Sequence, residues 1–118
     1  MAEITRLGMA KRYSEAAIHN GVVYIAGQVP EHTLTQGIEA QTMEVLAMID
    51  RVLEQTGSSK KHLLRVQIFL ADLADFDGMN SVWDAWVEPG FAPPRATVEA
   101  KLAKPSYRVE IVVTAAQA

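Results

Sequence analysis

Hydrophobic and polar positions alternate in short runs along the first third of the chain, a pattern typical of β-strands. Residues 4–7 and 13–19 give weak strand patterns, and Val-Val-Tyr-Ile at 22–25 gives a clear one. Asn20 and Gly21 separate the second run from the third, and both residue types tolerate the positive φ angles of a type I′ turn. The pattern therefore predicts a short strand followed by a tight hairpin.

The apolar spacing becomes helical in the middle of the chain. From Ile38 to Thr56 the apolar positions fall mostly on one stripe, and Gly57 follows where a helix commonly ends. Residues 64–70 alternate again and predict a long strand. A second helical stripe begins after Asp72 or Asp75, either of which can cap its first turn. This stripe consists of Phe76, Met79, Val82, Trp83, Trp86 and Val87.

Two further alternating runs, 95–101 and 107–114, predict strands near the end of the chain. The link between them, residues 102–105, is short enough to predict an antiparallel pair. The predicted order is strand, strand, strand, helix, strand, helix, strand, strand, which makes this an α+β chain. Two helices can cover one face of such a sheet. The other face must meet water or another subunit, so we expect oligomerisation.

Charge predicts the register of the terminal hairpin. Placing Thr97 opposite Glu110 sets Glu99 opposite Arg108, an attractive pair, whereas a slip of two residues sets two glutamates opposite each other. In the first register Arg95 and Glu110 become diagonal neighbours, roughly 7–8 Å apart at Cα. Arg95, Thr97 and Glu110 would then share the open face of the sheet, and the alternate residues would pack against the helices.

Composition narrows the possible classes of protein. The 118 residues suit a single domain, 1–118, and 49% hydrophobic with 21% charged residues is typical of a globular fold. A net charge of −3 disfavours binding of nucleic acid or of an anionic membrane. The absence of cysteine excludes disulfides and a thiol nucleophile, and three scattered histidines do not suggest a metal site. With no long apolar segment at its start, the chain is predicted to be soluble and cytoplasmic.

Arg95, Glu110 and Thr97 are the foremost candidates for chemistry. Arg95 follows two prolines, and its planar guanidinium can bind a carboxylate or phosphate with two hydrogen bonds. It can equally be a surface arginine or a salt-bridge partner. Glu110 lies in the middle of a strand, where glutamate is uncommon, so it either pairs with a cation or holds a water molecule. Thr97 can donate a hydrogen bond, although threonine is also an ordinary strand residue.

Three other residues are weaker candidates for a binding site. Tyr13 can line a pocket or simply pack. Asn80, on the second predicted helix, can face a ligand or water. Gly27 follows a strand and offers backbone N–H groups that suit a carboxylate, but it can also serve only as a turn residue.

Five segments in order resemble the Rid family, the reactive-intermediate (enamine/imine) deaminases also called RidA or YjgF-like proteins, and within it the YoaB-like branch. The segments are Ile25–Pro30, Phe69–Phe76, Met79–Trp86, Pro94–Val98 and Arg108–Ile111. The resemblance covers nearly the whole chain. It implies a chorismate-mutase-like fold, which is a mixed sheet of about six strands with two helices on one face, assembled as a homotrimer with sites in clefts between subunits.

The resemblance also implies residue roles. Arg95 would bind the substrate carboxylate and Glu110 would hold or activate water, with Tyr13 and Asn80 at the same site. Thr97 stands where the family often has cysteine. Ala26 stands where it often has serine, which removes a hydroxyl beside Gly27.

The implied reaction is hydrolysis of a 2-imino acid to a 2-keto acid and ammonia, without cofactor or metal. The alternatives are a small-carboxylate (keto-acid) binding module without turnover and a chaperone-like role. A nuclease is the least supported class, because the chain is acidic and lacks a histidine pair.

Overall fold

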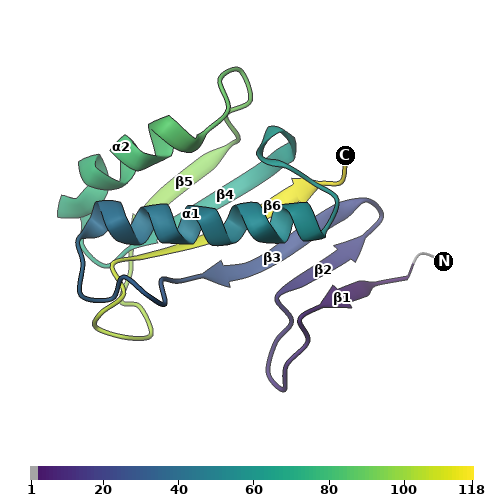
Figure 1. Ribbon diagram of the computed structural model, residues 1–118, viewed down its shortest axis with the longest axis horizontal. Coiled ribbons are helices and arrows are strands. Elements are labelled where there is room, and N and C mark those ends of the chain that lie inside the picture. Colours follow the sequence, from purple (N-terminus) through teal and green to yellow (C-terminus); the bar gives the residue numbers. More distant parts are fainter. Residues whose placement is uncertain (1–2) are drawn as a thin grey trace.

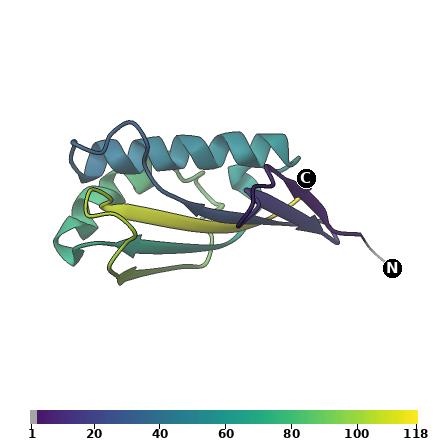
Figure 2. The ribbon, with the colours of Figure 1, turned by 90° about the horizontal axis from the view of Figure 1, so that it is seen from below.

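The computed structural model describes residues 3–118, which form a six-stranded sheet with two helices packed on one face (Figures 1 and 2). The element order matches the predicted one. The elements are β1 (Thr5–Leu7), β2 (Ala16–His19), β3 (Val22–Gln28), α1 (Ile38–Gln55), η1 (Lys60–His62), β4 (Leu63–Leu70), η2 (Leu73–Asp75), α2 (Phe76–Trp86), β5 (Arg95–Glu99) and β6 (Val109–Ala116).

Local turn and cap signals appear where the sequence predicted them. Asn20 and Gly21 have φ angles of 52° and 76°, and they join β2 to β3 as an antiparallel hairpin. Gly57 has a φ of 75° directly after α1, which is the left-handed conformation that glycine adopts at least cost. Asp72 accepts a hydrogen bond from the Ala74 N–H and so caps η2, the 3₁₀ turn that leads into α2.

The strand order, β1-β2-β3-β6-β4-β5, contradicts the predicted terminal hairpin. β4 lies between β5 and β6. It pairs with β5 in parallel and with β6 antiparallel. The reason is that α2 returns the chain over one face of the sheet and lays β5 beside β4 as a parallel neighbour. β6 then pairs on the other side of β4, where it fills the gap between β3 and β4.

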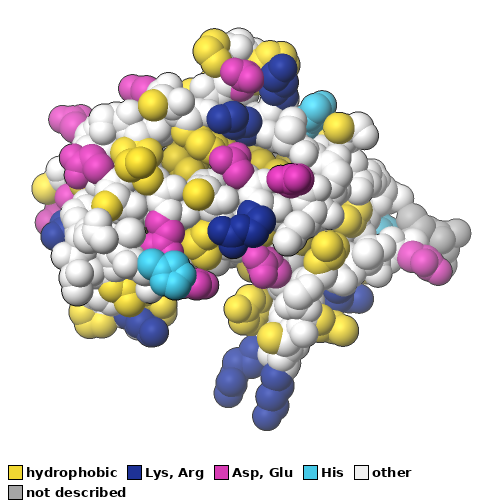
Figure 3. Space-filling view, in the orientation of Figure 1, with side chains coloured by type: hydrophobic (Ala, Val, Ile, Leu, Met, Phe, Trp, Pro, Cys, Tyr) yellow, Lys and Arg dark blue, Asp and Glu magenta, His cyan; other side chains and the backbone are white. Residues whose placement is uncertain are grey.

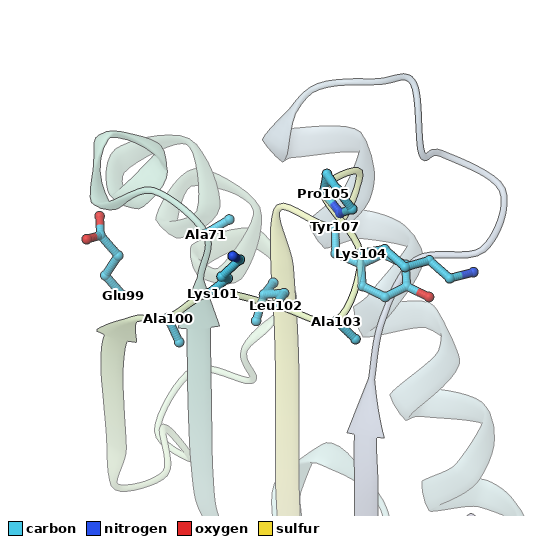
Figure 4. A pocket seen from close by; sticks show the side chains of 9 residues that line it. All are labelled: Ala71, Glu99, Ala100, Lys101, Leu102, Ala103, Lys104, Pro105 and Tyr107. Carbon is cyan, nitrogen blue, oxygen red and sulfur yellow. The ribbon is translucent and has the colours of Figure 1, made fainter.

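The segment from Ala100 to Arg108 is the connection that makes this order possible. It crosses the end of β4. It borders a cavity of about 690 Å³ that is open to solvent and lies beside Ala71, the residue that follows β4 (Figure 4). None of the candidate site residues lines this cavity. The prediction of an antiparallel pair from the short link 102–105 is therefore wrong, because the nine residues from Ala100 to Arg108 easily span two strand spacings when extended.

The predicted charge pairing between Glu99 and Arg108 is also wrong. Arg108 Nη1 instead donates to Asp75 Oδ2 at 3.2 Å, and Glu99 Oε1 accepts from the Leu73 N–H at 3.0 Å. Both partners belong to η2, which sits at the end of β4. These bonds tie the crossing segment to the start of α2.

The two faces of the sheet differ, as predicted for a sheet with only two helices: one face is covered by them and the other is open. On β6, Val109, Ile111 and Val113 are fully buried beneath the helices, whereas Glu110, Val112 and Thr114 alternate with them on the open face. Large apolar side chains also lie on that open face, including Tyr24 and Val98, which are 51% and 44% exposed. Between residues 3 and 118 no helix has the length and hydropathy to cross a membrane.

Gln41, a fully buried residue of α1, fixes the start of β6. Its amide nitrogen donates to the carbonyls of Ser106, Thr33 and Gln36, at 3.0, 3.3 and 3.4 Å. Its amide oxygen accepts from the Arg108 N–H at 2.8 Å. One side chain therefore links the helix, the loop before it and the segment that leads to Glu110.

Candidate functional site

Arg95 begins β5 and points towards the helices. The parallel ladder places it beside Val66, a buried residue on the helix side of β4, and laterally paired residues face the same way. Arg95 Nη1 donates to Asn80 Oδ1 on α2 at 2.8 Å, and the guanidinium carbon lies 5.1 Å from the ring centroid of Trp83. The structure thus brings together two of the predicted residues, Arg95 and Asn80.

Burial and charge act on Arg95 in opposite directions. Partial burial lowers the pKa of its guanidinium, and the nearby Asp84 carboxylate raises it in part. A guanidinium starts from so high a pKa that it keeps its charge at neutral pH. The bond to Asn80 uses one of the five N–H donors of Arg95, and the others are suited to an anion.

Thr97 lies two residues further along β5 and faces the same side as Arg95. Its hydroxyl oxygen is buried and has no hydrogen-bond partner among the residues that the structure describes. Buried hydroxyls are nearly always bonded, so the Thr97 hydroxyl is an exception, and it shares this property with Thr42 in the core.

Glu110 and Gly27 form a second group, on the open face. The ladder sets Glu110 opposite Phe69, the residue between the buried Ile68 and Leu70. Its carboxyl group lies over Gly27, where the pairing of β3 and β6 shifts by a bulge. A Cβ at position 27 would overlap Glu110 Oε2 and lie 3.0 Å from its Cδ. Glycine at this position therefore leaves room for the carboxylate.

Tyr13, in the loop after β1, lies near Gly27. Its side chain is 65% exposed. Together with Gly27 and Gln28 it lines a small cavity of about 110 Å³, to which Glu15 also contributes. Tyr13 is therefore close to Gly27 at one end of β3, whereas Glu110 does not line this cavity.

The prediction that Arg95, Thr97 and Glu110 share one face of the sheet is wrong. Arg95 and Thr97 point to the helix side, and Glu110 points to the open side. On β4, Arg95 is paired with Val66 and Glu110 with Phe69, which lies three residues further along. The strands that carry Arg95 and Glu110, β5 and β6, lie on opposite sides of β4 and so are two strand spacings apart. Strand spacing and rise then put the Arg95 and Glu110 Cα atoms about 14 Å apart. Within one chain they cannot hold one small molecule.

The error has a physical cause. Ala96 and Val98 are the apolar residues of β5, so alternation assigned them to the core. In the structure they face the open side, because β5 is an edge strand whose inner residues meet α2 through polar contacts.

The prediction that Trp83 belongs to the core is confirmed by its 6% exposure, but its contact with Arg95 was not predicted. The sequence does hold a signal for this contact. Asn80 and Trp83 are three residues apart on one helix and so share a face, which means that a residue bound to Asn80 also lies near Trp83. Two residues of α2 therefore cradle the guanidinium, one through a hydrogen bond and one through its ring.

Glu44 fixes the loop that follows β3. Its carboxylate accepts hydrogen bonds from the N–H groups of Glu31, His32 and Thr33 and from the Thr33 hydroxyl, at 2.7 to 3.1 Å. Burial raises the pKa of Glu44, but these hydrogen bonds outweigh it, so the pKa lies below the ordinary value of 4.5. The loop begins at Val29, which lines the cavity shared by Tyr13 and Gly27.

Comparison with known proteins places this fold in a family. Residues 3–117 match the family described as Endoribonuclease L-PSP. A crystal structure of a YjgF-family member from Neisseria meningitidis superimposes with a TM-score of 0.95 at 47% identity, covering 98% of this chain and 96% of that one. A Rid-family protein from Yersinia pestis gives a TM-score of 0.83 at 30% identity, with 92% and 90% covered.

Named relatives agree with this placement. A RutC family protein of Haemophilus influenzae is 51% identical over 95% of this chain and 97% of its own length. The RutC family protein YoaB of Escherichia coli is 49% identical over 96% of this chain and 97% of its own length. The chain belongs to the L-PSP family, whose members here carry the names RutC, YjgF and Rid, and it is YoaB-like within it. The predicted resemblance and fold class are confirmed.

Proposed function

We propose that this protein is an enamine/imine deaminase that hydrolyses 2-imino acids to 2-keto acids and ammonia, at a site completed by two copies of the chain. One copy supplies Arg95, Asn80 and Thr97. Its neighbour supplies Glu110, Gly27 and Tyr13. The observation that carries the proposal is the guanidinium of Arg95, oriented by Asn80 at 2.8 Å and by the ring of Trp83, with donors left for a carboxylate.

The division of these residues between two faces supports a shared site. Each half holds only part of the predicted set, since the first has Arg95 and Thr97 without Glu110, and the second has Glu110 without Arg95. The exposed Tyr24 and Val98 give the open sheet face the apolar surface that an interface between copies requires. We propose the closed trimer that the family resemblance implies, because cyclic assembly repeats the same contact at every subunit.

Substrate binding begins with the carboxylate. The 2-imino acid would place its carboxylate against Arg95 in two parallel hydrogen bonds, and the Thr97 hydroxyl would donate a third. Backbone N–H groups near Gly27 would bind the same end of the substrate from the other copy. This arrangement fixes the imine carbon within reach of Glu110.

Hydrolysis then needs one water and one proton carrier. Glu110 holds the water by accepting its hydrogen bond and takes a proton as the oxygen attacks the imine carbon. The product of this step is a carbinolamine. The carbinolamine is neutral when the imine enters protonated. Glu110 returns the proton to nitrogen and then accepts the hydroxyl proton as the C–N bond breaks and the C=O bond forms. The 2-keto acid leaves, and the released ammonia takes that proton from Glu110 and leaves as ammonium, which restores the carboxylate. General-base assistance of this kind is worth roughly 10²–10⁴-fold. The scheme uses neither cofactor nor metal and suits a cytoplasmic setting.

A coupled assay tests the proposal. An amino-acid oxidase supplies fresh 2-imino acids from a panel of amino acids, a trapping reagent captures the surviving imine, and keto-acid release is measured with and without the protein. We expect faster keto-acid release with the protein. Arg95→Ala should abolish this effect and Arg51→Ala, an exposed arginine of α1, should retain it. Full activity of Arg95→Ala would refute the carboxylate clamp.

The alternative function, a keto-acid binding module, predicts a different outcome of the same assay. Such a module would bind a 2-keto acid through Arg95 without accelerating imine hydrolysis. Isothermal titration of a 2-keto acid, run beside the assay, separates the two because it detects binding whether or not turnover occurs.

A further inference from the structure

None of the candidate site residues lines a groove between α1 and α2, although Trp86 of the groove packs on Trp83, with ring centroids 5.4 Å apart. Its volume is about 430 Å³, and its lining is mostly apolar. Figure 3 shows the corresponding hollow between the two helices, with apolar side chains inside it and charged ones beside it. Leu46 forms its buried floor at 1% exposure, and Met43 stands at its rim at 62% exposure.

The groove exists because small residues face each other across the two helices. Ala47 of α1 and Ala85 of α2 both line it, and neither reaches far enough to close the gap. Val82 supplies further apolar wall. The solvent side of a helix is ordinarily polar, so an apolar hollow of this size on the helix layer indicates a binding surface. Its volume lies in the range of small-molecule sites, about 300–1,000 Å³.

Trp86 forms one end of the groove and is flanked by opposite charges. Its indole N–H donates to Asp50 Oδ2 at 2.9 Å, which fixes the ring, and Lys60 Nζ lies 5.3 Å from the ring centroid. Across residues 3–118, neither Asp50 nor Lys60 forms an ion pair within 4.0 Å. An acid and a base thus stand beside one aromatic ring, both lining the groove and neither neutralised by a salt bridge.

We propose that this groove binds a free α-amino acid with a large apolar side chain. The ammonium group would lie at Asp50, the carboxylate at Lys60, and the side chain on Leu46, Val82 and the Trp86 ring. A zwitterion carries both charges within a few atoms and therefore matches both groups at once. A simple carboxylate would meet the repulsion of Asp50, and a simple amine would meet that of Lys60.

Nuclear magnetic resonance can test this directly, because the chain has two tryptophans and so two indole N–H signals. The Trp86 signal is the one that disappears in Trp86→Phe. We expect L-phenylalanine to shift it saturably. Hydrocinnamate, which lacks the ammonium, phenethylamine, which lacks the carboxylate, and glycine, which lacks the apolar side chain, should each bind at least about fivefold more weakly.

Variants assign the two charges. Asp50→Asn keeps a side-chain oxygen that can accept the hydrogen bond from the Trp86 indole N–H, so the ring stays in place. The ammonium group of the amino acid then loses its charged partner. This variant and Lys60→Gln should each weaken L-phenylalanine binding at least about fivefold. The exposed remote residues Asp77 and Lys101 provide the controls Asp77→Asn and Lys101→Gln, which should bind normally.

Arg95→Ala distinguishes this groove from the proposed imine site. Binding at the groove should survive that substitution, and it should survive even if the protein has no deaminase activity. The proposal is overturned if L-phenylalanine gives no saturable shift, if hydrocinnamate binds as tightly, or if Arg95→Ala abolishes the shift while Asp50→Asn preserves it.

Discussion

Arg95 and Glu110 point to opposite faces of the same sheet, with β4 between the strands that carry them. If both residues serve one substrate, they must come from different copies of the chain. Variants that lack one of the two residues should therefore complement each other in a mixed oligomer. Arg95→Ala and Glu110→Gln should each lose most activity when alone, the first by about 10²-fold from a lost charged hydrogen bond and the second by about 10²–10⁴-fold.

Mixed oligomers of the two variants should recover activity. A randomly mixed cyclic trimer that contains both variants holds one complete site in three, so a 1:1 mixture should regain about one quarter of wild-type activity. The measurement is imine hydrolysis after joint refolding. Mixing Arg95→Ala with the double variant Arg95→Ala/Glu110→Gln is the control and should stay inactive. An inactive 1:1 mixture of assembled variants would mean that the site is not shared.

Gly27→Ala should act on Glu110 without a large loss of stability. The new methyl group would occupy the place of Glu110 Oε2, and the flexible carboxylate can move aside. Misplacement of a reacting group by about 1 Å costs up to about 10²-fold in rate. We therefore expect a fall in kcat with little change in Tm.

Gly37→Ala is the matched control for that substitution. A Cβ at Gly37 would lie 3.7 Å from Glu39 Oε1, an ordinary contact, and the residue has a φ of −80°. Its kcat should equal that of the wild type. Equal kcat values for both alanine variants would contradict the assigned role of the space at Gly27.

Gln41→Leu should destabilise the whole fold. The substitution leaves the Arg108 N–H and the Ser106 carbonyl without their partner in a buried region. Each buried group left unsatisfied costs about 1–3 kcal/mol, so a loss of about 3 kcal/mol in unfolding free energy is expected. Denaturant unfolding measures it. Gln55→Leu, the same change at an exposed position of the same helix, should stay within about 0.5 kcal/mol of the wild type.

Glu44 should give the loop at residues 31–33 a dependence on pH. Its folded-state pKa lies below the ordinary 4.5, because hydrogen bonds from Glu31, His32 and Thr33 favour the charged carboxylate. The stability that it contributes is therefore present above pH 4.5 and is lost as the pH falls through the lowered folded-state pKa.

The Tm difference between the wild type and Glu44→Gln measures that contribution. It should be constant from neutral pH down to about 5 and then shrink as the carboxylate is protonated. Amide hydrogen exchange at His32 and Thr33 should quicken over the same range. A Tm difference that stays unchanged down to pH 3 would contradict the role assigned to the carboxylate.

Features set by neighbouring residues were predictable from sequence, and features set by distant pairing were not. Asn20, Gly21 and Gly57 reveal their turns because positive φ angles select particular residue types. The order of β4, β5 and β6 depends on where α2 returns the chain, which no short-range pattern encodes. Charge complementarity between Glu99 and Arg108 was consequently misleading, since both side chains bond to η2 instead.

The candidate site likewise has one part that was predictable from sequence and one that was not. The family resemblance named Arg95 and Asn80, and the structure joins them by a hydrogen bond. Alternation assigned Arg95 to the wrong face, because β5 is an edge strand and its apolar Val98 faces outwards. Periodicity shows which residues of a strand point the same way, but it does not show which of the two faces the helices cover.

β6 is the final strand in chain order and yet lies in the interior of the sheet, paired on both sides. Its partners, β3 and β4, were synthesised long before it, and until it arrives they have no strand between them to hydrogen-bond. The sheet therefore cannot close before residues 109–116 are available to pair. A nascent chain stalled shortly before β6 would expose two unpaired strand edges, one on β3 and one on β4, to aggregation.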